Sequence, residues 1–330
     1  MPMSSLRLLG LALILARGSD ALKVAIAGAA GRTGRLVVAE ALQRQYEVVA
    51  LVRSPRAARK VLPTDDENLT VQKVDLGAAS TDELREAVSG ADAAIWCASG
   101  FSDASNPLNR LRGLFTVKFR PEEYIEVAGL TRFGEAMATA PGVAEGGPQL
   151  VMCSAAAVTR PSWDDAKKEA LAGCADIPIV RLNPLGILDV KAQGERELRG
   201  SGCRYTIIRP TGLNDKWPAG RPVLTQGDVA VGRICRADVA HLLTAMLAEA
   251  GAVGKTVEAT ALSGYPKPRS YGAALDRCVA DADADGPQLD EEIVAARYAL
   301  MQQLLPGEPR SVAIMSVTHI TPHGRPRDDH

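Results

Sequence analysis

The sequence predicts an α/β fold in which a doubly wound parallel sheet is covered by helices on both faces. Short apolar runs alternate with helical stretches from Leu22 onward, and three β–α units fall within the first ninety residues. A glycine-rich turn directly follows the first of these runs. The chain has 330 residues, 46% of them hydrophobic, and is therefore long enough to bury such a sheet.

Six strands are expected, each a β-rich apolar run: residues 22–27, 47–52, 69–74, 93–98, 150–153 and 205–208. Helices are expected between the first of them, at residues 31–43, 54–61 and 81–88. Ser80 and Glu83 stand at capping-box spacing, which predicts where the third helix begins.

The N-terminal residues 1–21 have the layout of a secretory signal peptide. Arg7 precedes an apolar run at residues 8–16, and Ser19 and Ala21 are small residues at the -3 and -1 positions of a cleavage site. The run is too short to span a bilayer stably. The alternative is a disordered or helical extension. The signal favours the secretory pathway or a plastid over the cytoplasm, and the destination stays open.

Two further regions depart from the strand–helix rhythm. Residues 101–148 are longer than one crossover helix requires and contain an expected helix at 122–138, so they form either a solvated surface insertion or a flap over a ligand. Residues 263–330 begin with a Pro-rich break, followed by a helix near 290–305 and a tail. The region between the signal and this break, residues 22–262, is expected to form the main domain.

Composition excludes several classes of function. The 38 basic and 39 acidic side chains give a net charge of -1, which does not fit non-specific binding of nucleic acid. The six cysteines are far apart and never form a C-x-x-C pair, so we expect neither a disulfide framework nor a zinc site. No stable membrane span is expected.

The glycine turn carries the strongest functional signal. Gly28, Gly31 and Gly34 are spaced G-x-x-G-x-x-G between the first strand and an amphipathic helix. The first glycine permits a tight turn, the second allows a pyrophosphate to approach the backbone, and the third lets helix and strand pack closely. The phosphates would then lie at the N-terminus of the helix, where its dipole favours an anion. The pattern predicts a dinucleotide site rather than a purely structural turn.

The end of the second strand indicates which dinucleotide. NAD-binding proteins usually carry a carboxylate there for the ribose 2′-hydroxyl, whereas this chain has Arg53, followed by Arg56. A guanidinium can instead pair with a 2′-phosphate, and Arg32 adds further charge. NADP is therefore expected rather than NAD. By position, Asp75 lies near the adenine.

Three further motifs, in order, show a resemblance. They are the segments VMCSAAAVTRP at 151–161, RGSGCRYTIIRPTGL at 199–213 and RADVA at 236–240. With the glycine turn, they make the chain resemble the atypical short-chain dehydrogenase/reductases of the NAD(P)H-binding, NmrA-like family. The resemblance implies a six- or seven-stranded Rossmann sheet, a small C-terminal substrate lobe over the nicotinamide, and a small-molecule substrate. It also implies that Asp238 opens the helix closing the substrate side.

The resemblance carries over to catalysis only in part. Ser154 matches the catalytic serine and Lys191 the lysine, but Ile187 stands four residues before Lys191, where orthodox members have a tyrosine that transfers a proton. In a related branch of the family a lysine near this place is thought to be the acid or base. Lys191 can therefore bind the ribose or stabilise an oxyanion. The alternative is a surface lysine paired with Glu195 one helical turn later.

The candidate catalytic residues are Lys191 and Ser154. The candidate cofactor-binding residues are Gly28, Ala30, Gly31, Arg32, Thr33, Gly34, Arg53, Asp75, Ala98, Ser99, Ser154, Lys191, Pro210, Gly212 and Leu213. Two functions remain open. The first is an NADP-dependent oxidoreductase that transfers hydride to a small carbonyl, quinone, flavin or conjugated alkene. The second is a non-catalytic NADP(H)-binding redox sensor or assembly protein. A protein partner or a homodimer is compatible with either.

One competing motif lies near the C-terminus. Residues 281–292 match the D-x-D-x-D-G-x5-E pattern of a calcium-binding loop. Pro287 and Gln288 depart from that loop, and no second copy of the pattern occurs. Because acidic residues also stabilise the first turn of a helix, the sequence favours a helix start over a metal site.

Overall fold

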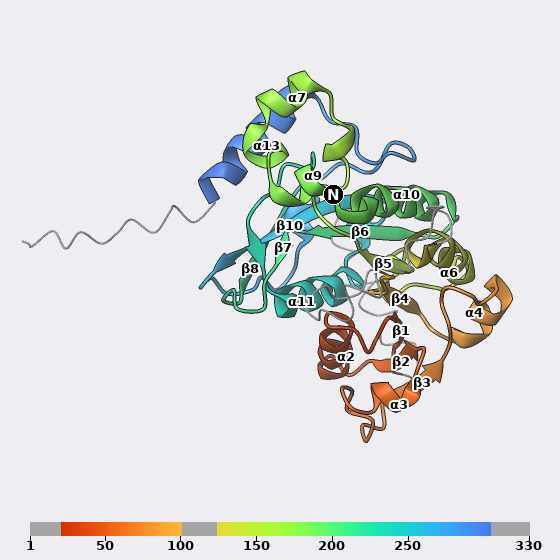
Figure 1. The fold of residues 1–330 in the computed structure, drawn as a ribbon. Helices are drawn as coiled ribbons and strands as arrows, with labels where there is room; N and C mark the ends of the chain where they lie inside the picture. Colours follow the sequence, from red (N-terminus) through yellow and green to blue (C-terminus); the bar gives the residue numbers. More distant parts are fainter. Residues whose placement is uncertain (1–20, 101–123, 305–330) are drawn as a thin grey trace, which may run out of the picture.

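The computed structural model describes residues 21–100 and 124–304, which form an α/β fold built around one large sheet (Figure 1). Its eight strands lie in the order β3-β2-β1-β4-β5-β6-β10-β8. Their bounds are Lys23–Ala27 (β1), Glu47–Val52 (β2), Leu69–Lys73 (β3), Ala93–Trp96 (β4), Leu150–Cys153 (β5), Tyr205–Pro210 (β6), Gly220–Thr225 (β8) and Lys255–Ser263 (β10). The predicted doubly wound sheet is confirmed, because the chain moves outward from β1 in one direction and from β4 in the other.

Two strands extend the sheet beyond the sequence prediction. All neighbouring strands are parallel except β10 and β8, which pair antiparallel at the edge. The segment of β8, GRPVLT, contains Gly220, Arg221 and Pro222, which are not typical of a strand. Its place at the sheet edge allows such residues, because Pro222 needs no ladder partner on its open side. The sheet therefore has eight strands rather than the six or seven implied by the resemblance.

Helices cover both faces of the sheet. On one face lie α2 (Gly34–Gln43), α3 (Pro55–Ala58) and α11 (Arg236–Met246), which share one apolar core with Val24 and Ile26. On the other lie α4 (Thr81–Ala87), α6 (Leu130–Met137) and α10 (Ile187–Gly200), whose core includes Ala25 and Ala27. Alternate residues of β1 thus point into different cores, as a strand buried on both faces requires. The predicted capping box before α4 is present.

The part of residues 101–148 that the structure describes is a crossover connection. The π-helix η2 (Ile125–Gly129) continues into α6, which buries Leu130, Phe133 and Met137 against the sheet between β4 and β5. Residues 101–123 lie outside the described ranges. The expected helix at 122–138 thus corresponds to η2 and α6, and it packs on the core.

A small lobe lies beyond β6 and β10. It contains η3 (Arg160–Ser162), α7 (Asp165–Ala170), α8 (Ala172–Ala175), α9 (Pro178–Leu182), η4 (Pro184–Gly186) and α13 (Glu291–Leu304). A two-stranded sheet of β7 (Gly212–Leu213) and β9 (Arg233–Ile234) and the short helix α12 (Gly272–Leu275) lie against the main core, which includes Ile234 and Leu275. The 3-10 turn η5 (Ala250–Ala252) precedes β10. Figure 1 shows α7 next to α13. Trp163, Leu171 and Cys174 share a core with Val294 and Met301 of α13.

The lobe therefore combines the segment after β5 with the C-terminal helix, whereas sequence analysis looked for it only after residue 263. The expected helix at 290–305 is α13. The proposed signal, residues 1–21, lies outside the described ranges except for Ala21, and so does the tail after Leu304. Within the described part of the chain, no helix is long and apolar enough to cross a membrane.

Candidate functional site

The glycine turn is closed by backbone contacts that leave no room for side chains. A Cβ on Gly28, whose φ is +75°, would lie 2.7 Å from the backbone of Ala98, just after β4. A Cβ on Gly34 would lie 2.2 Å from the carbonyl oxygen of Gly28. The Gly31 amide donates to the same oxygen at 2.9 Å. Strand β1, helix α2 and the end of β4 thus meet backbone to backbone, as a dinucleotide-binding turn requires.

Other predicted cofactor residues follow the carboxyl ends of the neighbouring parallel strands, on the same side of the sheet as the glycine turn. Arg53 follows β2 and is exposed, and Ser54 caps α3 by accepting from the Ala57 amide at 3.3 Å. Asp75 follows β3 and accepts from the Gly77 amide at 3.1 Å. Ser99 follows β4 and donates to Glu126 of η2 at 2.6 Å. The parallel sheet brings these positions to one edge, in the order of its strands.

Ser154, just after β5, contacts Glu195 of α10 in the interior of the protein. Ser154 follows β5 and donates its hydroxyl hydrogen to Glu195 Oε1 of α10 at 2.5 Å. The other carboxylate oxygen accepts from Arg209 Nη2 of β6 at 2.5 Å and from Arg199 Nη2 at 3.2 Å. Glu195 is fully buried. The alternative that Glu195 supports Lys191 at the helix surface is therefore wrong, because this carboxylate faces the interior.

The charge of Glu195 is set by its neighbours. Burial alone would raise its pKa, but Arg209 and Arg199 and the Ser154 hydroxyl outweigh burial and hold the pKa below its usual value. Glu195 is therefore a carboxylate at neutral pH. Because a carboxylate only accepts hydrogen bonds, the hydrogen on Ser154 Oγ points toward it.

Lys191 lies one helical turn before Glu195 and is half-buried. Burial raises the pKa of the Cys153 thiol to about 11, and the nearby charges of Lys191 and Arg236 act in the opposite direction. Burial also raises the pKa of Cys97 well above its usual value, again opposed by Lys191. Because Cys97 directly follows β4 and Cys153 ends β5, both cations act electrostatically at the edge that carries the glycine turn.

Arg236 was missed by sequence analysis, which took only Asp238 from its motif. Asp238 accepts from the Gly220 amide at 2.8 Å and lies 3.3 Å from Lys267, so it fastens the start of β8. Arg236 Nη1 contacts Asp215 Oδ1 at 2.7 Å, and Arg32 Nη2 contacts Asp215 Oδ2 at 2.6 Å. Asp215 therefore bridges the glycine turn and the start of α11.

The expected binding loop after β6 is partly built into a second sheet. Gly212 and Leu213 form β7 and pair with Arg233 and Ile234 of β9. The carbonyl of Pro210 accepts from the Ala156 amide at 2.9 Å. Both residues of β7 are exposed, and the loop continues to Asp215. It lies next to the segment after β5, which carries Ser154.

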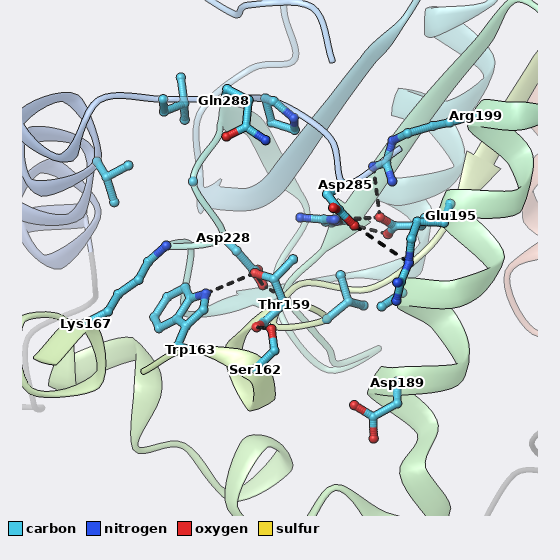
Figure 2. A pocket seen from close by; sticks show the side chains of 18 residues that line it. Thr159, Ser162, Trp163, Lys167, Asp189, Glu195, Arg199, Asp228, Asp285 and Gln288 are labelled. Atoms are coloured by element: carbon cyan, nitrogen blue, oxygen red, sulfur yellow. Dashed lines mark hydrogen bonds and ion pairs between the residues drawn. The ribbon is translucent and has the colours of Figure 1, made fainter. Parts of the chain in front are cut away.

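A cavity of about 510 Å³ lies on the other side of Glu195 (Figure 2). Glu195, Arg199 and Arg209 line one wall, and Trp163 and Lys167 lie on the opposite side. Lys167 Nζ stands 4.7 Å from the centre of the Trp163 ring. Sequence analysis missed this cavity because its walls come from segments far apart in the chain, from Val158 to Val294.

Asp228 fixes the backbone between the cavity and Ser154. Its carboxylate accepts from the amides of Ala157 at 2.6 Å and Thr159 at 2.9 Å. Ala157 and Asp228 have φ angles of +78° and +57°, which residues other than glycine rarely adopt. Arg160 is fully buried and donates to the carbonyl of Asp228 at 2.7 Å. These contacts hold a strained loop in one conformation.

The calcium-like pattern at residues 281–292 has a structural explanation. Asp281 accepts from Arg199 Nε at 2.9 Å, from the Thr256 hydroxyl at 2.6 Å and from Tyr205 at 3.1 Å. Asp281, the first carboxylate of the pattern, thus pairs with the buried Arg199. Glu291 and Glu292 occupy the first turn of α13, as the competing interpretation expects. Within the described residues, no cluster of three metal-ligating side chains occurs.

We expect Gly34→Ala to destabilise the protein by about 1–3 kcal/mol, because its Cβ would collide with the Gly28 carbonyl and more than cancel the helix propensity gained. Gly251→Ala is the matched control, since a Cβ there meets nothing within 4 Å. Urea denaturation followed by circular dichroism measures both. Equal stabilities would show that the turn can relax.

We expect Glu195→Gln to cost about 3–5 kcal/mol at pH 7, because it leaves the buried guanidinium of Arg209 without its paired carboxylate and removes one of the two carboxylates that Arg199 contacts. The pKa of Glu195 is lower in the folded state, so its contribution is complete above 4.5 and is lost as pH falls through the folded pKa. Denaturation midpoints between pH 7 and 3 should therefore fall less steeply for the variant. Glu197→Gln, an exposed change on the same helix, should match the wild type at every pH.

The geometry agrees with comparisons to known proteins. A profile of the NAD(P)H-binding family matches residues 28–250. An uncharacterized chloroplastic protein of Arabidopsis thaliana is 30% identical over 251 residues, which cover 76% of this chain and 80% of that protein.

Solved structures share the fold at low sequence identity. The oxidoreductase ylbE of Lactococcus lactis superimposes with a TM-score of 0.54 at 17% identity, covering 77% of this chain and 95% of that one. A short-chain dehydrogenase/reductase of Veillonella parvula in complex with NADP gives 0.51 at 17% identity, covering 76% and 100%. At such identities the likeness concerns the fold alone.

Proposed function

The chain belongs to the NAD(P)H-binding family of Rossmann-fold oxidoreductases, and from this premise we propose that it is an NADP-dependent reductase of the atypical short-chain dehydrogenase type. Its proposed substrate is a small carbonyl, quinone, flavin or conjugated alkene. The observation that carries the proposal is the closed glycine turn at the same sheet edge as Ser154 and Lys191.

The residues present fit a dinucleotide. Gly28 and Gly34 let β1, α2 and the end of β4 meet backbone to backbone, which gives the tight turn on which a diphosphate would lie. Arg53 would pair with the 2′-phosphate, since residues 53–56 contain no carboxylate. The remaining proposed contacts come from the turn and the neighbouring strand ends: Ala30, Arg32, Thr33, Asp75, Ala98, Ser99, Pro210, Gly212 and Leu213. When bound, the nicotinamide supplies a hydride.

Lys191 is the proposed catalytic residue. Its ammonium lies near the ends of β4 and β5, where it can donate to a ribose hydroxyl or to an oxygen that gains charge. Ile187 cannot transfer a proton. Because Ser154 gives its hydrogen to Glu195, its oxygen presents only lone pairs to the site. Ser154 therefore orients a donor on the substrate or on Lys191 and does not itself donate.

The cavity beside Glu195 is the proposed substrate pocket. Its volume of about 510 Å³ suits a small planar molecule, and the side chains of Trp163 and Lys167 offer an aromatic and a cationic contact. Glu195 lies between the pocket and Ser154, so a substrate held in the pocket must extend past this carboxylate to reach the crevice.

A second candidate function is a non-catalytic NADP(H) sensor or assembly protein. Ile187 in place of the tyrosine and the engaged hydrogen of Ser154 favour it, because both remove orthodox proton donors. Binding of NADPH without oxidation by any quinone, flavin or carbonyl supports this candidate. For either function we propose the plastid as the compartment, which the chloroplastic relative supports.

We expect the protein to bind NADPH at least about tenfold more tightly than NADH, and Arg53→Ala to remove this preference by lowering only NADPH affinity. Isothermal titration calorimetry measures the dissociation constants. Arg85→Ala on α4, a similarly exposed arginine on the other side of the sheet, is the control. If both nucleotides bind equally to the wild type, NADP preference is wrong; if neither binds, the reductase proposal fails.

We expect Lys191→Met to lower kcat/KM for NADPH oxidation by about 10²-fold or more, since its ammonium would stabilise the oxygen that gains charge as hydride is transferred. Ser154→Ala should cost far less, because its hydrogen is already engaged by Glu195. Steady-state kinetics with quinone and flavin acceptors measure both, and Lys168→Met, a partly exposed lysine of α7, is the control. A loss in Ser154→Ala as large as in Lys191→Met contradicts these roles.

A further inference from the structure

Two arginines from distant parts of the chain converge on one carboxylate beside the glycine turn. Arg32 lies inside the turn, and Arg236 is the first residue of α11. Asp215, in the loop after β7, receives one guanidinium on each of its two oxygens, at 2.6 and 2.7 Å. These contacts join residues 183 and 21 positions apart.

The three groups differ in how far the fold buries them. The Arg236 side chain is only 14% exposed, whereas those of Arg32 and Asp215 are 44% and 49% exposed. Arg236 also acts electrostatically on the Cys153 thiol at the end of β5. The backbone that carries Arg32 is held by the contacts of the glycine turn. Arg236 is therefore fixed by the fold, Arg32 projects from a rigid backbone, and Asp215 reaches both from a surface loop.

We propose that Arg32 and Arg236 form a phosphate-binding subsite for the dinucleotide, and that Asp215 occupies it as an internal competitor until the cofactor arrives. The subsite deepens the proposed function and depends on it. Its ligand class is a phosphate group of a pyridine dinucleotide.

Phosphate and carboxylate oxygens make the same charge-assisted contacts with guanidinium groups, so one can replace the other between the two arginines. The turn that carries Arg32 is the place where a diphosphate lies in such folds. Exposed ion pairs contribute little free energy, so the loop can release both arginines at low cost when a phosphate takes them over. Asp215 then swings toward solvent.

Binding kinetics distinguish an internal competitor from a loop that closes over the bound cofactor, here called a clasp. A competitor must leave before the phosphate enters, so it slows association. A clasp that closes over bound cofactor slows dissociation instead. Trp217 lies two residues after Asp215, in the same loop, and provides a fluorescence signal for loop opening.

The test is NADPH binding to the full chain by calorimetry and by stopped-flow tryptophan fluorescence. Asp215→Asn should bind NADPH about three- to tenfold more tightly, through faster association with little change in dissociation. Arg236→Gln should bind about tenfold more weakly. Asp65→Asn, an exposed aspartate at the opposite edge of the sheet, should match the wild type.

A second pair of variants separates competition from a general charge effect. When Arg32→Gln and Arg236→Gln are combined, the further change Asp215→Asn should have no effect, because no arginine remains for Asp215 to release. An equal gain in that background overturns the proposal. So does a wild type that binds NADPH while Asp215→Asn binds equally or more weakly; in that case the proposed cofactor stands. If no variant binds NADPH or NADH, both proposals fall.

Discussion

The buried carboxylate of Glu195 is the interaction on which the rest of the site depends. It joins Ser154 after β5, Arg209 of β6 and Arg199 of its own helix, and Arg199 extends the network to Asp281 and Thr256. These contacts fix the rotation of α10 about its axis and its position along the sheet. Lys191, one turn earlier, is placed at the ends of β4 and β5 as a consequence. The same side chain forms the wall between Ser154 and the cavity.

This network exists because the buried side chains on one face of the sheet change from apolar to charged between its centre and β10. On the face that carries α10, the apolar layer runs from Ala25 to Ile207 and then gives way to Arg209, Thr256 and Glu258. Three arginines and four carboxylates share the buried region: Arg160, Arg199, Arg209, Glu195, Asp228, Glu258 and Asp281. Burial and the neighbouring Asp228 raise the pKa of Glu258, while the amides of Asp228 and Ala230 donate to its two oxygens.

Sequence analysis succeeded where the signal is local. The glycine turn and the capping box at Ser80 depend on residues within a few positions of one another, and each lies where it was expected. The contacts of Glu195, Asp228 and Asp281 join residues up to 82 positions apart, and no spacing rule reports them. Glu195 and Asp281 were assigned instead to helix-surface and calcium-like patterns, because a local pattern does not say which side of an element faces inward. The cofactor and catalytic assignments remain predictions.

The polarity of the Ser154 hydrogen bond determines what chemistry the site can support. In the orthodox arrangement the serine hydroxyl donates to the substrate, and a tyrosine supplies the proton. Here the serine hydroxyl donates to a charged carboxylate, with 2.5 Å between the two oxygens, and Ile187 stands where the tyrosine would be. Withdrawing that hydrogen would leave Glu195 with only its two arginines in a fully buried position, which costs free energy. In the proposed reductase, the proton for the reduced product would therefore come from Lys191, from water or from the substrate. Quinones and flavins satisfy this condition best, because their reduced forms are stabilised anions that can take up a proton from solvent after reduction.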